Sequence, residues 1–144
     1  MLVVRRRPGR PSADLVGLCI AVSSSNSNGN GSFVALATAT VTVPADCTRA
    51  VVLTSAAAGA STNGSGGSFI EAYASIGGHN SGPLSVWIPT RTGSSVVVPH
   101  AFLLTGLTPG GTFTVQCFAL ETSPANITAA SVGGSIAGSV IFLR

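Results

Sequence analysis

The chain has 144 residues, the size of one domain, and charged residues make up only 8% of it, against roughly 25% in an average soluble domain. Apolar residues make up 45%, and Ser, Thr, Asn and Gly supply most of the polarity. Four of the seven Arg are Arg5, Arg6, Arg7 and Arg10, whereas residues 11–144 carry three Arg against four acids. This balance excludes the basic stripe of a nucleic-acid-binding domain. A surface so poor in charge favours a protein that packs against copies of itself or against partners.

The first 31 residues are predicted to form a separate piece, followed by a domain over residues 32–144. This piece reads as a basic arm, one apolar strand and a flexible Ser/Asn/Gly link. Pro8, Pro11 and Asp14 separate the basic cluster from the apolar run, and no convincing cleavage site follows, so no signal peptide is predicted. The apolar runs are far shorter than the roughly 20 residues of a membrane span, so no membrane contact is expected.

Hydrophobicity alternates with a period of two along the chain, which is typical of half-buried strands. In residues 37–43 Ala and Val alternate with Thr, and residues 112–117 repeat the pattern. Clusters of Gly, Pro, Ser and Asn at 23–31, 59–67, 77–83 and 108–111 predict turns. Strands are predicted at 14–22, 33–43, 49–55, 69–76, 84–88, 95–104, 112–120, 126–132 and 135–143.

No segment carries a convincing helical stripe, so the predicted fold is all-β. Eight or nine short strands at this spacing indicate an antiparallel β-sandwich of about eight strands, of jelly-roll or immunoglobulin-like type, preceded by an extended N-terminal arm.

Several predicted strands are apolar on both faces, above all the run from Val96 to Leu104. One face would fill the sandwich and the other would meet a neighbouring subunit. The predicted oligomer interface consists of Val96, Val98, Phe102 and Leu104, with a homotrimer as the favoured assembly. Pro99 interrupts this run and predicts a bulge or an edge strand.

The sequence contains few residues that could act in catalysis. Neither His79 nor His100 has a Cys, Asp or second His at ligand spacing, so no metal, no cofactor and no catalytic residue is predicted. The chain is therefore not expected to be an enzyme. The odd set of Cys19, Cys47 and Cys117 predicts no disulfide framework, and Cys19 and Cys117 are expected to be small core residues.

The N-terminal arm has two interpretations. Gly9, Arg10 and Pro11 are similar to the core of an AT-hook, but Pro8 stands where that motif has Arg. A basic run can bind phosphate without sequence specificity, or it can dock on an acidic protein surface. Docking is favoured because the rest of the chain has no supporting basic patch. The predicted partner-docking residues are Arg5, Arg6, Arg7 and Arg10, and no specific nucleic acid is expected.

Two stretches resemble the terminal β-sandwich domains of minor tail proteins from actinobacterial tailed phages. In TVPADCTRAVVL (Thr42–Leu53) a strand ending in Val-Pro leads through a short turn into an apolar strand. In LTGLTPGGTFTVQCFAL (Leu104–Leu120) a Leu-Thr-Pro-Gly turn leads into an alternating strand, and the chain closes with Ile141–Arg144. The resemblance covers roughly residues 33–144. It implies a minor tail component in the virion, which binds other virion proteins through the arm and presents the sandwich outward.

Two alternatives stay open. In the phage family such domains usually end a longer polypeptide, whereas here the sandwich follows a short arm, so a capsid decoration protein that stabilises the head is the second interpretation. A host-surface glycan-binding module is the third, because Trp87 and Tyr73 could stack on sugar rings. Trp87 lies within the apolar run Leu84–Ile88, however, which favours a core or interface position for it.

Overall fold

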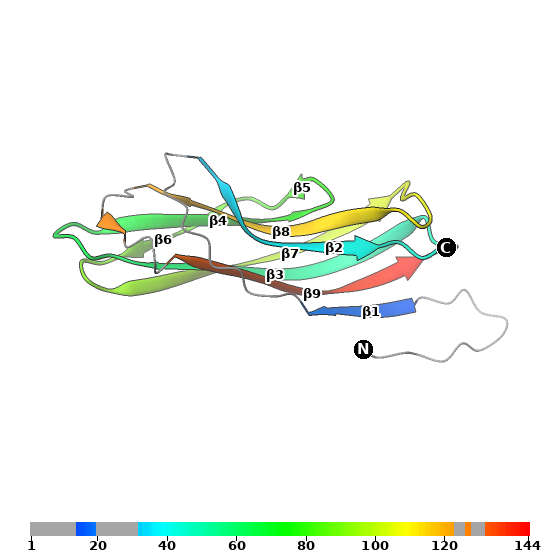
Figure 1. The fold of residues 1–144 in the computed structure, drawn as a ribbon, viewed down its shortest axis with the longest axis horizontal. Helices are drawn as coiled ribbons and strands as arrows, with labels where there is room; N and C mark the ends of the chain where they lie inside the picture. The colour runs from blue at the N-terminus through cyan, green and yellow to red at the C-terminus, as the bar shows by residue number, and fades with distance from the viewer. Residues whose placement is uncertain (1–13, 20–31, 123–125, 128–131) are drawn as a thin grey trace.

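The computed structural model describes residues 14–19, for which only the backbone is considered, and residues 32–122, 126–127 and 132–144 with their side chains. These residues form an elongated β-sandwich whose strands run along its long axis (Figure 1). The strands are β1 (Asp14–Cys19), β2 (Val34–Thr42), β3 (Arg49–Ser61), β4 (Ser68–Ile76), β5 (His79–Asn80), β6 (Leu84–Ile88), β7 (Gly93–Thr105), β8 (Thr112–Glu121) and β9 (Gly133–Leu143).

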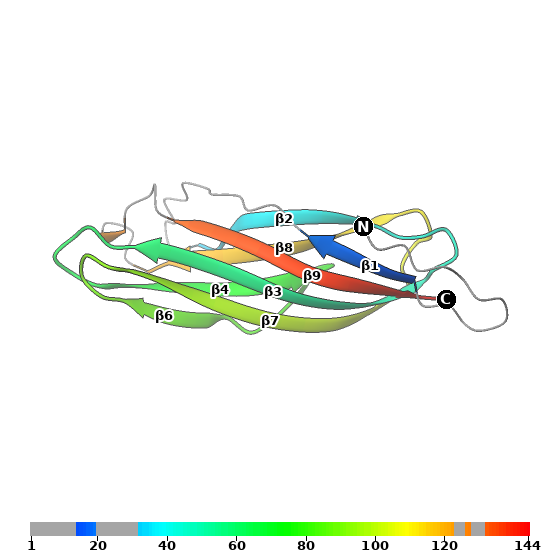
Figure 2. The ribbon, with the colours of Figure 1, turned by 90° about the horizontal axis from the view of Figure 1, so that it is seen from below.

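The strand pairing is nested, with the first strand beside the last. β1 pairs with β9, β2 with β8, β3 with β7 and β4 with β6, all antiparallel. Sheet A has the order β1-β9-β3-β7 (Figure 2), and sheet B has the order β2-β8-β4 with β5 and β6 beside β4. Apart from the two-residue strand β5, eight strands are divided between the two sheets in this way, which makes a jelly roll. The predicted all-β antiparallel sandwich is confirmed, and the topology selects the jelly roll over the immunoglobulin-like alternative.

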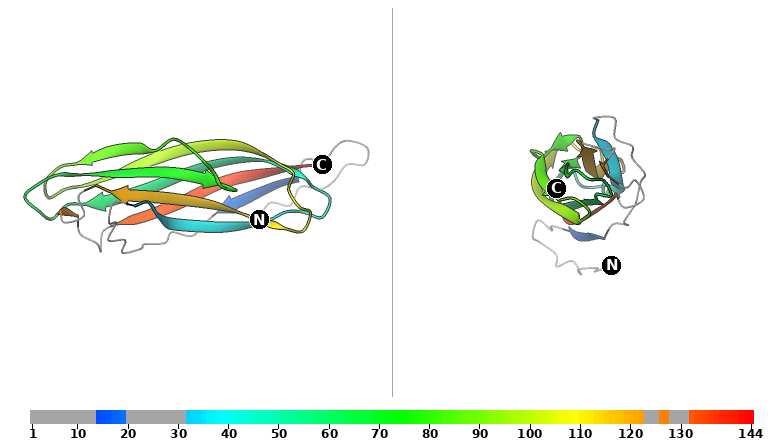
Figure 3. Two further views of the ribbon diagram at one scale, coloured as in Figure 1. Left: turned by 90° about the horizontal axis from the view of Figure 1, so that it is seen from above. Right: turned by 90° about the vertical axis from the view of Figure 1, so that its left-hand side faces the viewer.

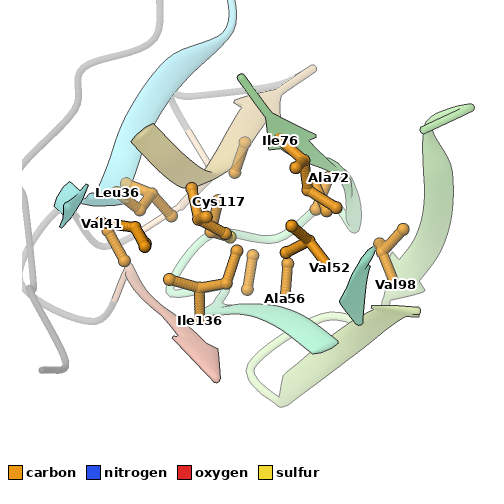
Figure 4. Close-up of a cluster of buried hydrophobic side chains, with 14 of the residues drawn as sticks. Leu36, Val41, Val52, Ala56, Ala72, Ile76, Val98, Cys117 and Ile136 are labelled. Carbon is orange, nitrogen blue, oxygen red and sulfur yellow. The ribbon is translucent and has the colours of Figure 1, made fainter. Parts of the chain in front are cut away.

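The two sheets enclose one hydrophobic core, and seen end-on they curve around a common interior (Figure 3). Leu36 and Val41 of β2, Val52 and Ala56 of β3, and Ile136 of β9 point into this space (Figure 4). The inward residues of β3 are small, mostly Ala and Val, and each is buried. Period-two patterning therefore produces the core as the sequence predicts, since alternate side chains of each strand meet between the sheets.

Several strand limits differ from the prediction. β3 continues to Ser61, so the predicted turn at 59–67 begins too early, because Gly59 still pairs with Ser95 and Gly133. The predicted strand at 126–132 is wrong where it can be checked, since Ile127 makes only an isolated bridge with Thr62. Residues 128–131, like residues 20–22 of the predicted first strand, lie outside the described part of the chain.

β1 lies in the piece assigned to residues 1–31, yet its backbone pairs with β9 from Asp14 to Cys19 as an edge of sheet A. The strand within the piece over residues 1–31 is therefore part of sheet A. β7 forms the other edge of sheet A, and its pairing with β3 has no bulge. The prediction that Pro99 marks an edge strand is confirmed.

Gly138 in β9 provides a test of how closely the central strands of sheet A approach. A Cβ added there would lie 2.3 Å from the Leu53 carbonyl oxygen, on the backbone of β3. Gly133, in the same strand, has nothing within 4 Å of the same position. We expect Gly138→Ala to lower the free energy of unfolding by about 1–3 kcal/mol, as overpacking does. Gly133→Ala is the matched control and should leave it unchanged or slightly raised. Urea unfolding of both variants at equal protein concentration measures this, and equal stabilities would contradict the packing described.

Candidate functional site

The structure corrects the predicted oligomer interface. Val96, Val98 and Leu104 are buried in the core of the sandwich, and Phe102 is half-buried. Val98 is seen among the core side chains (Figure 4). The three buried side chains are not available to a second copy of the chain, so the prediction is wrong for Val96, Val98 and Leu104. The physical reason is that β7 is apolar in both phases of its alternation, and hydrophobicity alone does not choose between them.

The outward phases of β3 and β7 form a largely aliphatic surface with a few serines, here called the sheet A outer face. Leu53, Val97 and Leu103 are 46%, 54% and 51% exposed on it. The register places Leu103 opposite Val51 and places Leu53 opposite Ala101, so these side chains adjoin across β3 and β7. Among the described side chains of β3, β7 and β9, only Arg49, at one end, brings charge to this face.

A shallow hollow of about 410 Å³ lies beside Leu53 on this side of the molecule. Its lining consists of Leu53, Thr54, Pro99, His100 and Ala101. The Thr54 hydroxyl donates a hydrogen bond of 3.2 Å to the His100 carbonyl, which leaves the hollow predominantly apolar. A hollow next to exposed aliphatic side chains suits the insertion of an apolar side chain from a second surface.

The outward face of sheet B is different, because it carries aromatic rings. The ring centroids of Phe69 on β4 and Trp87 on β6 are 4.7 Å apart, and the two rings meet edge-to-face. The Tyr73 ring of β4 stacks on the Phe118 ring of β8, with their centroids 4.9 Å apart. The Phe33 ring meets the Tyr73 ring edge-to-face, with their centroids 4.8 Å apart. Trp87 is 49% exposed and Phe69 44% exposed, so of the predicted core or interface position for Trp87 the core position is wrong and the interface position stays a prediction. We call this surface the aromatic face.

Polar side chains accompany these rings. Glu71 lies between Phe69 and Tyr73 on the same side of β4. On β8, Gln116 donates a 3.1 Å hydrogen bond to the Thr38 hydroxyl of β2, and it accepts one of 3.4 Å from Thr114. Burial raises the pKa of Tyr73 above its ordinary value, so its hydroxyl is neutral at physiological pH and can donate a hydrogen bond.

Most other described charges lie at the ends of the sandwich. Arg144 forms an ion pair with Asp46, and Arg49 donates a 2.7 Å hydrogen bond to the Arg144 carbonyl. Arg91 lies just before the start of β7, whereas Arg49 lies opposite Thr105 at its end. The charge-bearing ends thus leave the two broad faces nearly neutral.

The two histidines lie close together, but they do not form a metal site with other described residues. The His79 ring stacks on Phe102 at 4.0 Å, and the Nε2 atom of His100 lies 3.2 Å from the His79 carbonyl oxygen. Within the part of the chain that the structure describes, no three His, Cys, Asp or Glu residues gather as metal ligands would. Glu71 and Glu121 belong to opposite phases of sheet B, because Glu71 pairs with Leu120 and Glu121 with Ile70.

The arm residues Arg5, Arg6, Arg7 and Arg10 lie outside the described residues, so their docking role stays a prediction. The prediction did not include Leu53, Val97 and Leu103 as surface residues. The polar residues Arg49, Ser55 and Ser61 mark the outward side of β3, and the pairing of β3 with β7 then shows which side chains of β7 point outward. The prediction also missed Phe69 and Phe118. Phe118 continues the outward phase of Thr114 and Gln116, and that alternation was the available signal.

Comparison with known proteins gives no family assignment. No protein-family model matches the chain, and no curated protein matches it. It is similar to a chain in the structure of infectious bursal disease virus, Gt strain, with 13% sequence identity and a TM-score of 0.38. The superposition covers 99% of this chain and 37% of that one, so this chain spans little more than a third of its length. A likeness of this size carries no argument about function. Among the described residues, no helix has the length and hydrophobicity to cross a membrane.

Cys117 is a core residue, as predicted, and its chemistry can be tested. Burial raises the pKa of its thiol to about 11 from the ordinary 9.0, against a smaller lowering by a backbone hydrogen bond from Ser135. We expect iodoacetamide at pH 8 to leave Cys117 unmodified in the native protein and to label it after unfolding, as peptide mass spectrometry would show.

The same shift predicts a pH dependence of stability. Because the folded-state pKa is raised, the contribution of Cys117 is fully present below pH 9.0 and is lost as the pH rises through about 11. Wild type should therefore lose stability relative to Cys117→Ala over that window. Labelling of native Cys117 at pH 8, or parallel stability profiles of the two proteins, would contradict the described burial.

Proposed function

We propose that this chain is a structural protein of a virion, a minor tail component of a tailed phage that assembles with copies of itself through the sheet A outer face. The basic arm joins the assembly to a larger virion protein, and sheet B faces outward. A homotrimer is the favoured assembly, and the protein acts by packing rather than by catalysis.

The sheet A outer face is the observation that carries this proposal. Leu53, Val97 and Leu103 are about half exposed on neighbouring strands, and no described acid lies among them. Soluble monomers rarely leave a broad apolar patch open to water, so such a patch marks a surface that a partner covers. The adjacent hollow at Pro99 and Ala101 makes that surface uneven, and a protein surface of complementary shape can fill the hollow.

The sequence resemblance supports the tail assignment. Thr42–Leu53 spans the end of β2, the following turn and the start of β3, and Leu104–Leu120 spans the β7–β8 connection and most of β8. Both stretches thus coincide with a strand, turn and strand, which is the arrangement that the phage domains share with them. A capsid decoration protein is the second candidate, and the jelly-roll topology favours it because viral capsid proteins use this fold. The fold alone does not choose between the two locations.

Self-association through the sheet A outer face can be tested with Leu53→Asp. An unpaired carboxylate at this position would be desolvated in the interface at a cost of about 3 kcal/mol or more, which weakens association roughly a hundredfold. Light scattering after size exclusion should show an oligomer for wild type and a monomer for the variant at the same micromolar concentration.

Leu84→Asp is the matched control, because Leu84 is the same residue type with the same 46% exposure but lies on β6 of sheet B. It should keep the wild-type mass. A monomeric wild type, or an equal loss of mass in both variants, would show that copies do not associate through this face.

The arm makes a separate prediction. Deleting residues 2–11 should leave a folded, self-associating sandwich that is no longer incorporated into particles, because Arg5, Arg6, Arg7 and Arg10 supply the directed hydrogen bonds of docking. Mass spectrometry of purified particles measures the copy number. Replacing the four Arg with Lys keeps the charge but removes the bidentate geometry, so incorporation should be reduced rather than lost. Normal incorporation of the deletion variant would place the anchor in the sandwich.

A further inference from the structure

We propose that the aromatic face of sheet B is a carbohydrate-binding site, on which Trp87, Phe69 and Tyr73 stack against pyranose rings while Glu71 and Gln116 hydrogen-bond to sugar hydroxyls. The ligand class is a neutral oligosaccharide of pyranose units. This inference goes beyond the proposed function and does not depend on it, because the site lies on the sheet opposite the proposed contact between copies.

The distribution of aromatic residues is the first observation. The chain has six Phe, one Tyr and one Trp, and five of these eight lie on the aromatic face: Phe33, Phe69, Tyr73, Trp87 and Phe118. Only two, Phe113 and Phe142, are core residues. A chain that needed large rings for its core would bury them, since each ring is a major source of hydrophobic stabilisation there. Here most of the rings lie on the outside of one sheet.

Trp87 is held in place rather than loosely exposed. A Cβ at Gly67 would lie 2.0 Å from Cζ2 and 2.5 Å from Cη2 of the indole, so the ring packs directly against the Gly67 backbone. The edge-to-face contact with Phe69 supports it from the neighbouring strand. An aromatic ring fixed in this way loses little conformational entropy on binding, and half of its surface is still open to a ligand.

The polar groups select a hydroxyl-rich ligand. Glu71 lies between the two ring pairs, and among the described residues no hydrogen bond or ion pair engages its carboxylate. Gln116 and its threonine partners add amide and hydroxyl groups at the side of Tyr73. A carboxylate and an amide are strong partners for sugar hydroxyls, while the ring faces match the apolar C–H faces of a pyranose. With no described basic residue on these strands, the face does not suit phosphate or nucleic acid.

The same comparison argues against a second copy as the occupant. The sheet A outer face is aliphatic and carries no described acid, whereas the aromatic face has a carboxylate at its centre. Covering Glu71 with an apolar protein surface would leave a buried charge without a partner, which is costly. Phe69 and Tyr73 are four residues apart, or about 13 Å along β4 at the usual rise per residue, so the two ring pairs would contact different, non-adjacent units of one oligosaccharide.

The single Trp makes the site directly observable, because all tryptophan emission of the chain comes from Trp87. We would titrate the full chain with cellohexaose, chitohexaose and a β-1,4-galactan oligosaccharide, with sorbitol as a polyol lacking an apolar ring face. At least one of the oligosaccharides should give a saturable change in emission at micromolar to millimolar concentration, and sorbitol should give none.

Variants separate binding from folding. Phe69→Ala and Glu71→Gln should each weaken the response about tenfold, and Glu71→Gln changes no shape, so misfolding does not explain its effect. Trp87→Ala should abolish retardation in affinity gels that contain the polymer of the responding oligosaccharide. Leu84→Ala, on the same strand with similar exposure, should leave it unchanged. Gly67→Ala should alter the emission without sugar and weaken binding, because the added Cβ would displace the indole of Trp87 from its position against the backbone.

Three results would overturn the proposal: no saturable response to any of the three oligosaccharides, an equal response to sorbitol, or unchanged affinity in both Phe69→Ala and Glu71→Gln. An emission change that depends on protein concentration alone, with no response to sugar, would assign the aromatic face to self-association and also overturn it. The effect of Leu53→Asp on mass is measured without sugar, so the proposed function and this inference fail separately.

Discussion

The register of β3 between β7 and β9 is the constraint on which the rest of the structure depends. β3 pairs along all 13 of its residues with β7, and it pairs with β9 on its other side. Because side chains alternate, a slip of one residue would turn Arg49 and Ser55 into the core and the Ala and Val side chains outward. Thr54 is the polar residue of the inward phase, and its hydrogen bond to the His100 carbonyl satisfies its hydroxyl there. This register also determines which apolar side chains of β7 stay outside.

The sequence predicted the strands best where only one phase is apolar. On β8, Phe113, Val115 and Cys117 are buried as expected, because Thr and Gln in the other phase leave no choice. On β7 both phases are apolar, and the phase follows from the β3 register, a long-range pairing that the local pattern does not contain. The nested pairing of β1 with β9 is likewise set by contacts between the two ends of the chain, so the sequence left the jelly roll and the immunoglobulin-like fold both open.

The candidate surfaces were predictable in composition but not in position. Low charge and two-sided strands indicated an apolar contact surface, and Trp87 and Tyr73 stood out as stacking candidates. The sequence could not place Trp87 beside Phe69, because that contact requires the pairing of β4 with β6. The stacking of Tyr73 on Phe118 requires the pairing of β4 with β8 in the same way. Residues distant in sequence meet on one face only after sheet B has formed.

The placement of charge links the two broad faces. Asp46, Arg49 and Arg144 interact at one end of the sandwich, and Arg91 lies toward the other. Two broad faces with so little charge would invite non-specific association of a lone domain. In the proposed assembly the sheet A outer face is covered by copies of the chain, which removes its exposed aliphatic side chains Leu53, Val97 and Leu103 from water. The face left to solvent is then the one with Glu71, Gln116 and threonine hydroxyls among its rings, and these groups keep it hydrated until a ligand with matching hydroxyls displaces the water.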